Sequence, residues 1–237
     1  MRVLALDTAT QACSVALLDG GRLIGRHEEV SKSHAQRILG MIDSVLAEAA
    51  LPLSLLDGIA ASVGPGSFTG VRISVAVAQG LAFGAGLRVV PVTTLEALAF
   101  GAVRNGARQV LACLDARMGE VYWGCFRADA DRGVIAVGPV RVGPPGSVAL
   151  PLTPALPALG VYCGMGRGFT AYPVLGALPG LELDPTDALA LPDAREFAAL
   201  GALRLKLGGG IDAADLCPLY VRDKVALTEA ERGRPQP

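Results

Sequence analysis

The chain has 237 residues, of which 51% are hydrophobic and 18% are charged, and its formal net charge is −1. This composition is typical of a compact globular protein and excludes a disordered chain and a coiled coil. Lys and Arg form no cluster in the sequence. We therefore do not expect tight nucleic-acid binding by the chain alone, because affinity for a phosphate backbone depends on a concentrated basic face.

The cysteines and the N-terminus predict a cytoplasmic protein. The cysteines lack the C-x-x-C spacing of zinc and redox sites, which favours buried free thiols in a reducing compartment. They are Cys13, Cys113, Cys125, Cys163 and Cys217. The start, MRVLALDTAT, lacks the extended apolar segment of a signal peptide. Arg72 and Gln79 interrupt the most apolar predicted helix, which argues against a membrane span.

The first half of the chain predicts three strands followed by alternating helices and strands. Strands are expected at residues 3–7, 13–18, 22–29, 58–63 and 87–92, and helices at 33–50, 68–84 and after Thr93 or Thr94. Asp19-Gly20-Gly21 is the signal of a hairpin turn between the second and third strands. Ser33 and Gln36 have the spacing of a capping box at the start of the first helix.

The second half repeats the order of the first. Strands are expected at residues 110–115, 120–126, 133–137 and 160–163. Asp115 ends a strand as Asp7 does, and Gly164-Met165-Gly166 follows a strand as Gly64-Pro65-Gly66 does. These landmarks predict a duplicated βββαβα unit. The proline-rich residues 138–159 are interpreted as an irregular insertion in the second unit, and the tail from Glu229 is expected to be disordered.

Two tandem units with an acidic strand end in each are typical of the actin-like, Hsp70-like and sugar-kinase (ASKHA) architecture. We therefore expect an α/β fold of two actin-like lobes with a cleft between them, where members of this superfamily hold a nucleotide. The first lobe is expected to comprise residues 1–104 and about 211–237, and the second lobe residues 105–210.

Several stretches, in chain order, resemble the TsaB (YeaZ) family: LDTAT, SKSHAQRIL, VGPGSFTGVRI, LDARMGEVYWG and PLYVR at 218–222. The resemblance extends over about residues 1–226, and GPGSFTG-x-R is highly specific to this family. TsaB proteins are bacterial paralogues of the TsaD/Kae1 threonylcarbamoyl transferase. The resemblance implies a role in making threonylcarbamoyladenosine in tRNA, as a partner of the catalytic paralogue. It also implies a TsaE-type ATPase and tRNA reached through that complex, and a homodimer when the protein is alone.

Asp7-Thr8-Ala9-Thr10 departs from the D-x-G-T turn of the superfamily members that hydrolyse ATP. A glycine at the third position lets backbone N–H groups close on a phosphate, and this chain has Ala9 there. Asp115-Ala116-Arg117 departs from D-x-G in the same way, so both turns that orient metal ions for phosphoryl transfer are degraded. Two interpretations stay open: the aspartates cap strand ends or bond nearby N–H groups, or they keep a vestigial nucleotide contact.

The glycine loop leaves a similar choice. Gly70 is followed by Val71 and Arg72, so the Lys and Ser/Thr of a Walker loop are missing. Thr69 stands where a dinucleotide fingerprint has its third glycine. The loop is interpreted as a tight turn in which Ser67 caps the next helix, with weak anion or nucleotide contact as the alternative. The candidate nucleotide residues, all with weak signals, are Asp7, Thr8, Gly64, Gly66, Ser67 and Asp115.

No metal site and no catalytic residue are expected. The catalytic paralogue binds iron through H-x-x-x-H, in which two imidazoles share a helix face. This chain has His34 but Ile38 four residues later, and its other histidine, His27, lies on a predicted strand. Ser67 or Thr69 could pair with His34, but no carboxylate completes a triad. No cofactor is required, and ATP or ADP at the partner interface stays open.

The helix at 68–84 is apolar on two faces, and such a helix has to be covered on both. Ile73, Val77, Gly80 and Gly84 share one face, which we expect to back onto the sheet. The opposite face and the helix at 33–50 are expected to meet a partner, although the two helices could also cover each other within the monomer. The predicted partner interface comprises His34, Ile38, Met41, Val45, Val71, Arg72, Val75, Ala78, Gln79 and Ala82.

Two main functions remain, beside a third possibility, a nucleotide-sensing module without a role in tRNA modification. The first is a non-catalytic scaffold that dimerises with the catalytic paralogue through the first lobe and supports threonylcarbamoyl transfer to the adenosine next to the anticodon. The alternative is an enzyme that acts on its own, as a nucleotide-hydrolysing or glycoprotease-like peptidase member of the ASKHA superfamily. Turnover by the isolated protein separates the two.

Overall fold

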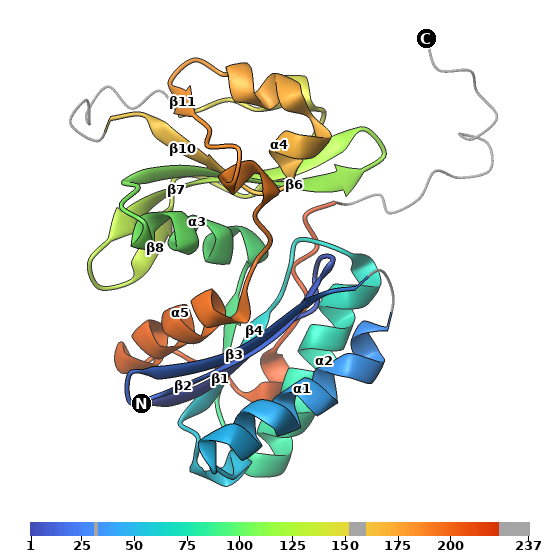
Figure 1. Ribbon diagram of the computed structural model, residues 1–237, viewed down its shortest axis with the longest axis vertical. Coiled ribbons are helices and arrows are strands. Elements are labelled where there is room, and N and C mark those ends of the chain that lie inside the picture. The colour runs from blue at the N-terminus through green and yellow to red at the C-terminus, as the bar shows by residue number, and fades with distance from the viewer. Residues whose placement is uncertain (31–32, 152–159, 223–237) are drawn as a thin grey trace, which may run out of the picture.

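Two β-sheets form the framework of the protein, and helices lie between them and outside them (Figure 1). The computed structural model describes residues 1–30, 33–151 and 160–222. Residues 152–159 of the expected insertion and the expected disordered tail from Glu229 lie outside this part of the chain. The predicted α/β fold of two lobes is confirmed.

The first sheet has five strands in the order β3-β2-β1-β4-β5. Its strands are β1 (Arg2–Asp7), β2 (Ala12–Asp19), β3 (Arg22–Glu29), β4 (Gly58–Ser62) and β5 (Val89–Val92). β1 to β3 form an antiparallel meander, and β4 and β5 run parallel to β1. α1 (His34–Ala49) and α2 (Phe68–Ala85) cover one face of this sheet, and α5 (Ala194–Lys206) covers the other. Burial on both faces explains why β1 is a continuous apolar run.

The second sheet repeats the order of the first. It runs β11-β10-β6-β7-β8, with β9 paired to β7. Its strands are β6 (Gln109–Arg117), β7 (Glu120–Asp129), β8 (Gly133–Ala136), β9 (Arg141–Gly143), β10 (Tyr162–Met165) and β11 (Leu181–Glu182). The β6–β7–β8 meander is antiparallel, and β10 and β11 run parallel to β6, as β4 and β5 do to β1. The predicted duplication of the unit is therefore confirmed.

The second unit departs from the predicted βββαβα pattern. The described residues between β8 and β10 form β9 and a short 3-10 turn at Pro145–Ser147, with no counterpart of α1 among them. The insertion is also not wholly irregular, because Arg141 pairs with Trp123 where β9 adds to β7. Prolines explain the missing helix, since Pro144 and Pro145 offer no N–H to a helix interior.

The aspartate landmarks correspond in space, but the glycine landmarks do not. Asp7 and Asp115 lie near the ends of equivalent strands, β1 and β6. Val3 pairs with Gly58, and its counterpart Leu111 pairs with Gly164. Gly164 therefore matches Gly58 and not Gly64, so the predicted glycine match was out of register.

Each lobe is completed by a helix from the other half of the chain. α3 (Thr94–Arg104) follows β5 but packs against β6, β7 and β8. α5 follows the second sheet but packs against β1, β2 and β4. One apolar core therefore joins both sheets through α3 and α5, and the packing crosses the expected lobe boundaries at 104/105 and 210/211.

The first helix begins without the predicted capping box. Ser33 has a φ of 88°, and its side chain makes no capping hydrogen bond. Its carbonyl oxygen accepts hydrogen bonds from the N–H groups of Gln36 and Arg37 at 3.0 and 3.1 Å. The prediction is wrong because a capping box needs an extended N-cap residue whose hydroxyl points at the helix N–H groups.

The other two predicted caps are confirmed. Ser67 Oγ accepts a hydrogen bond from the N–H of Gly70 at 3.4 Å, at the start of α2. Thr93 forms a complete capping box with Glu96, in which each side chain accepts the other residue's N–H. All five cysteines are free, as predicted, although only Cys13, Cys113 and Cys125 are buried and Cys217 is exposed.

The two faces of α2 are the reverse of those predicted. The predicted interface residues that are buried in the protein's own core are Ile38, Met41, Val45, Val71, Val75, Ala78 and Ala82. Gly80 and Gly84, which were assigned to the sheet, are exposed, and a Cβ on either would meet nothing within 4 Å. Ser74 Oγ donates to the carbonyl of Leu6 at 3.3 Å and so marks the face that packs on β1.

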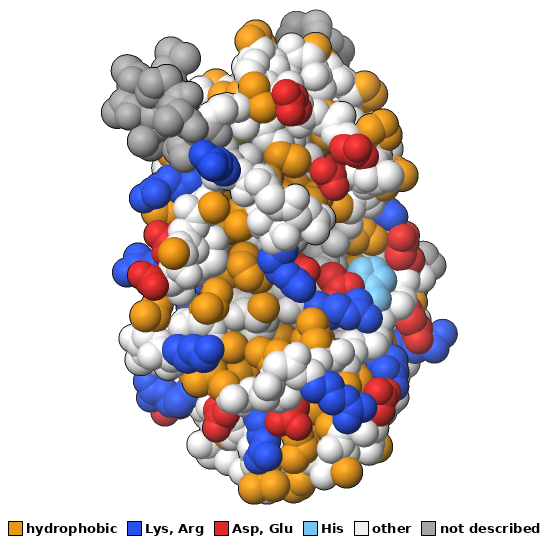
Figure 2. All heavy atoms as spheres, turned by 60° about the vertical axis from the view of Figure 1, so that its left-hand side comes forward, with side chains coloured by type: hydrophobic (Ala, Val, Ile, Leu, Met, Phe, Trp, Pro, Cys, Tyr) orange, Lys and Arg blue, Asp and Glu red, His pale blue; other side chains and the backbone are white. Residues whose placement is uncertain are grey.

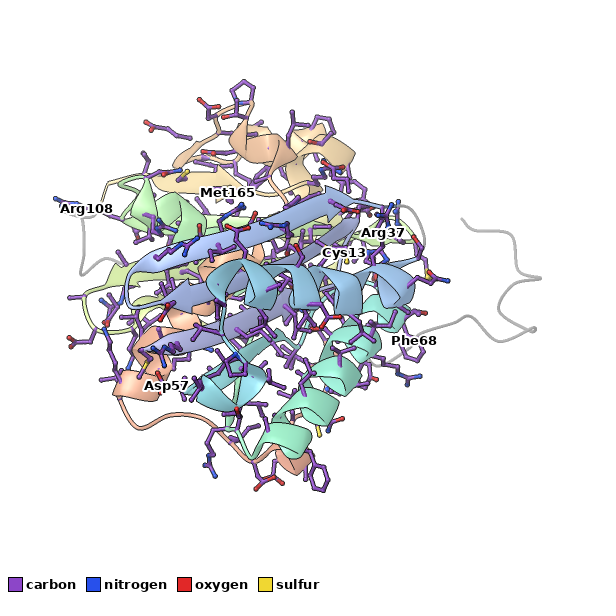
Figure 3. All side chains as sticks on the ribbon, turned by 60° about the horizontal axis from the view of Figure 1, so that its bottom comes forward. Cys13, Arg37, Asp57, Phe68, Arg108 and Met165 are labelled. Atoms are coloured by element: carbon purple, nitrogen blue, oxygen red, sulfur yellow. The ribbon has the colours of Figure 1, made fainter. Side chains whose placement is uncertain are left out.

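α2 is also the one described helix that is long and apolar enough to cross a membrane, judged by length and composition alone. A core helix of a folded protein meets the same criteria, and 33% of α2 is buried inside this fold. Figure 3 shows α1 and α2 lying across the outer side of the first sheet, with Phe68 at one end of α2.

The reversed faces predict how two substitutions on α2 behave. Val75→Glu places an unpaired charge in the core and should lower the free energy of unfolding by about 3 kcal/mol or more. Gly80→Leu, on the exposed face, should leave the fold intact and stabilise the helix by about 0.5–1 kcal/mol. Urea unfolding of both variants measures this. If Val75→Glu is stable and Gly80→Leu is unfolded, the face of α2 that contains Gly80 is the buried one.

Candidate functional site

A cleft of about 780 Å³ lies between the two lobes, as the fold predicts. This volume is typical of small-molecule sites. The first lobe contributes the β1–β2 turn, the start of α1, the glycine loop and the start of α2. The second lobe contributes the end of β6 and Arg167, and residues 219–222 of the C-terminal segment complete the wall.

Asp7 is fully buried and does not line this cleft. Its Oδ1 accepts a hydrogen bond from the N–H of Ala9 at 2.9 Å, whereas Oδ2 and the nearby Ser62 Oγ lack a hydrogen bond of normal geometry. Burial raises the pKa of Asp7 to about 6, against the lowering effects of the Ser62 hydroxyl and the Ala9 N–H. The expectation that Asp7 faces the cleft is therefore wrong, because the β1–β2 turn closes over it.

Asp115 is half-buried and does line the cleft. Its Oδ1 accepts a hydrogen bond from the N–H of Arg117 at 2.8 Å, and its Oδ2 lies 3.0 Å from the Arg117 guanidinium. The Tyr172 hydroxyl donates to Oδ1 at 3.3 Å. Asp7 and Asp115 thus bond the N–H two residues further on in both lobes, which favours the interpretation of these aspartates as turn-forming groups.

The glycine loop packs directly on the β1–β2 turn. The N–H of Ser67 donates to the carbonyl of Ala9, and the hydroxyl of Thr8 donates to the carbonyl of Gly70, both at 2.7 Å. A Cβ on Gly66 would collide with the Ala9 carbonyl, and one on Gly70 with the Thr8 carbonyl. The glycines are therefore needed for close backbone packing.

Only part of the predicted nucleotide set reaches the cleft. Thr8 and Gly64 are buried and do not line it, because Thr8 packs on Gly70 and Gly64 packs against Val71 and Leu219. Gly66, Ser67 and Asp115 line it. The N–H of Ser67 bonds the Ala9 carbonyl and the N–H of Gly70 bonds the Ser67 hydroxyl, so neither is open to a phosphate.

The three remaining predicted interface residues make specific contacts. His34 Nε2 lies 3.0 Å from the carbonyl oxygen of Thr10, beside the cleft. Gln79 is half-buried and donates to the carbonyl of Leu216 at 3.0 Å. Arg72 is exposed and contacts Phe68 and Tyr220. No group of three or more His, Cys, Asp or Glu side chains able to hold a metal ion occurs among residues 1–30, 33–151 and 160–222.

The C-terminal segment, residues 211–222, is the part of the site that sequence reasoning missed. The N–H of Leu219 donates to the carbonyl of Val63 at 2.8 Å, which joins the segment to the first lobe. Arg222 then pairs with Glu120 and donates to the carbonyl of Ala116 in the second lobe. The motif PLYVR marked this segment in the sequence, but its contacts span more than 100 residues and have no local signal.

A second link between the lobes lies across the first sheet. Arg167 pairs with Glu29 at 2.7 Å. Close by, His27 Nδ1 lies 3.0 Å from Oδ2 of Asp193, the N-cap of α5, and this hydrogen bond raises the pKa of His27 above its ordinary value. Strand pairing aligns His27 with Ser14 and Ser14 with Asp7, so a row of polar groups faces the start of α5.

The buried carboxyl of Asp7 predicts a pH dependence of stability. The folded state holds the proton more tightly, so the free energy of unfolding should fall as the pH rises from 3.8 to about 6. His27 adds a further fall above its unfolded pKa, since its folded pKa is also raised. Asp7→Asn removes the first fall and should raise the free energy of unfolding at pH 7 by up to about 3 kcal/mol.

Urea unfolding at a series of pH values measures this prediction. The amide nitrogen introduced by Asp7→Asn faces the Ser62 hydroxyl, which also lacks a normal hydrogen bond. Asp43→Asn, on the exposed side of α1, is the matched control and should keep the wild-type profile. If the free energy of unfolding of Asp7→Asn depends on pH as that of the wild type does, the pKa of Asp7 is not raised by folding and the prediction is wrong.

Comparisons with known proteins agree with this architecture. Residues 27–155 match the family model of TsaD, described as tRNA N6-adenosine threonylcarbamoyltransferase. The tRNA threonylcarbamoyladenosine biosynthesis protein TsaB of Escherichia coli (strain K12) is 39% identical over 227 residues, which cover 95% of this chain and 96% of that protein. The protein of the same name from Haemophilus influenzae is 50% identical over 124 residues, 52% of each chain.

A solved structure extends the similarity to three dimensions. YeaZ from Pseudomonas aeruginosa is 41% identical and matches with a TM-score of 0.83, covering 92% of this chain and 99% of that chain. Sequence similarity over nearly the whole length, the shared two-lobed fold and the GPGSFTG loop packed on the β1–β2 turn lead to one assignment. The chain belongs to the TsaB (YeaZ) family.

Proposed function

We propose that this protein is a non-catalytic partner of a TsaD-type transferase and supports the formation of threonylcarbamoyladenosine in tRNA. The role in threonylcarbamoyladenosine biosynthesis is supported by the names of the relatives from E. coli and H. influenzae. The partnership rests on a surface of the first lobe, the outer helix face. Its residues are Leu39, Ile73, Ala76, Val77, Gly80, Phe83 and Gly84.

The outer helix face is the observation that carries the proposal. Phe83 is 85% exposed and Leu39 is 52% exposed, which is unusual for large apolar side chains in a folded protein. Ala76, Gly80 and Gly84 between them are small and exposed. Small residues on a helix let a second helix approach closely, and exposed apolar patches mark interaction surfaces. The same surface suits a homodimer when the partner is absent.

Features of the cleft favour a non-catalytic role. Asp7 is sealed under its turn, and Asp115 is held by Arg117 and Tyr172. The two histidines lie on different elements, α1 and β3, so they lack the shared helix face of an H-x-x-x-H site. We expect a TsaE-type ATPase and tRNA to bind through the complex, in the cytoplasm. Binding experiments with ATP and ADP test separately whether a nucleotide lies at the partner interface.

A charge on the outer helix face should abolish the partnership without unfolding the protein. Ala76→Glu places an unpaired carboxylate within a contact of roughly 1,200–2,000 Å², where desolvation should weaken binding to the TsaD-type protein of the same cell by about 100-fold or more. The free energy of unfolding should change by less than about 0.5 kcal/mol.

Calorimetric titration and sizing chromatography measure this change. Ala130→Glu, in the exposed turn between β7 and β8 of the second lobe, is the matched control and should bind like wild type. If Ala76→Glu still binds with full affinity, the partner uses another surface and the proposal loses its main support.

The isolated protein should show no metal-dependent ATP hydrolysis, because neither aspartate is free to orient a metal–nucleotide complex. Phosphate release at saturating ATP and Mg²⁺ is the measurement, with Asp115→Asn as a control for contaminating activity. A turnover near 1 s⁻¹ that Asp115→Asn removes would make the protein an enzyme in its own right.

A further inference from the structure

Three side chains form an ordered stack at the mouth of the cleft. Phe68 begins α2, Arg72 follows one turn later, and Tyr220 comes from the C-terminal segment. The Arg72 guanidinium carbon lies 3.7 Å from the Phe68 ring centroid and 5.8 Å from that of Tyr220. Arg72 Nε donates to the Tyr220 hydroxyl at 2.9 Å, and the two ring centroids are 5.9 Å apart. We call this group the Phe68–Arg72–Tyr220 stack.

The stack is both exposed and positively charged. Phe68 is 43% exposed and Tyr220 is 50% exposed. Within the described part of the chain, Arg72 has no carboxylate partner. In contrast, Arg117, Arg167 and Arg222 around the same cleft each pair with an Asp or Glu. Arg72 therefore carries an uncompensated charge on a rigid aromatic surface.

Attachment of the C-terminal segment to the lobes does not explain why Phe68 and Tyr220 are exposed. The segment is already held by the Leu219 N–H on Val63, by Gln79 on the Leu216 carbonyl and by the Arg222–Glu120 pair. A purely structural anchor would gain stability from burying its rings. Phe68 and Tyr220 instead keep 43% and 50% of their surface exposed, as expected of side chains that another molecule covers.

We infer that the stack binds an unpaired base of single-stranded RNA and that Arg72 contacts an adjacent phosphate. Aromatic rings and guanidinium planes are the groups on which proteins stack splayed bases, and a guanidinium also bonds phosphate oxygens in a forked geometry. This inference rests on the proposed function in tRNA modification and extends it, since this chain then supplies a direct RNA contact of its own.

The exposure and the charge pattern favour a polymer over a free nucleotide. Small-molecule sites enclose most of their ligand, whereas this stack is open on the surface. Figure 2 shows basic and acidic side chains interspersed over one face of the molecule, and the net charge is −1. Because the net charge is −1 and the sequence has no cluster of Lys and Arg, RNA binding by the isolated chain is weak and salt-sensitive, and a partner has to supply further phosphate contacts.

Fluorescence anisotropy tests the inference with two labelled probes, a short single-stranded RNA and an anticodon stem–loop, at low salt. Each is titrated with the full chain alone and with the full chain saturated by the TsaD-type protein. Tyr220→Ala and Arg72→Ala should each weaken RNA binding by about fivefold or more. Tyr220→Phe keeps the ring and should stay within about twofold of wild type. Ultraviolet cross-links should map to peptides that contain Phe68 or Tyr220.

Two variants control for trivial effects. Leu207→Ala removes an exposed apolar side chain just after α5, outside both the cleft lining and the outer helix face, and should not change RNA binding. Tyr220→Leu keeps an apolar side chain against the segment, so it separates loss of stacking from loss of packing if Tyr220→Ala proves unstable. Tyr220→Leu should weaken RNA binding as Tyr220→Ala does.

Four results would overturn the inference. The first is RNA affinity at the wild-type level in Tyr220→Ala and Arg72→Ala, and the second is no RNA binding by the wild type, either alone or in the complex. The third is that the two variants lose binding of the TsaD-type protein while their RNA binding is unchanged. The fourth is that they lose binding of free AMP while their RNA binding is unchanged. The proposed function fails separately, when the wild type does not bind the TsaD-type protein, and RNA binding by the chain alone still tests the stack.

Discussion

The apolar layer formed by α3 and α5 between the two sheets holds the architecture together. α3 leaves the first sheet and covers the second, and α5 does the reverse, so each sheet depends on a helix from the other half of the chain. Phe126, Phe197 and Leu200 are buried in this layer with hardly any exposure. Because burial of apolar surface is the main stabilising term in folding, this shared core stabilises both units together.

Within that cleft, the glycines of the first lobe allow close backbone packing. The β1–β2 turn and the glycine loop share direct hydrogen bonds through Thr8, Ala9, Ser67 and Gly70. In these bonds the carbonyl groups of Ala9 and Gly70 accept from the protein itself. The same contact buries Asp7 in an apolar setting, which is why its pKa is raised. A cleft of ligand size and a tightly packed β1–β2 turn therefore coexist in this fold.

α2 connects the three regions on which the functional proposals depend. Its inner face anchors the first sheet, its outer face presents small and apolar residues, and its first turn holds the Phe68–Arg72–Tyr220 stack at the mouth of the cleft. Figure 3 places Phe68 at the same end of the helix pair as Arg37, near the start of α1. The outer helix face and the stack therefore share one helix.

The sequence by itself determined the strand and helix order of the first unit, the duplication of the leading strands, and the caps at Ser67 and Thr93, because these features depend on local patterns. Only the tertiary structure decided which face of α2 is buried, since a helix that is apolar all round has no periodic signal to mark its inner face. It also decided the left-handed conformation of Ser33, which prevents the expected cap. The bond between Arg72 and Tyr220 joins residues 148 positions apart, and no local pattern encodes a contact at that separation.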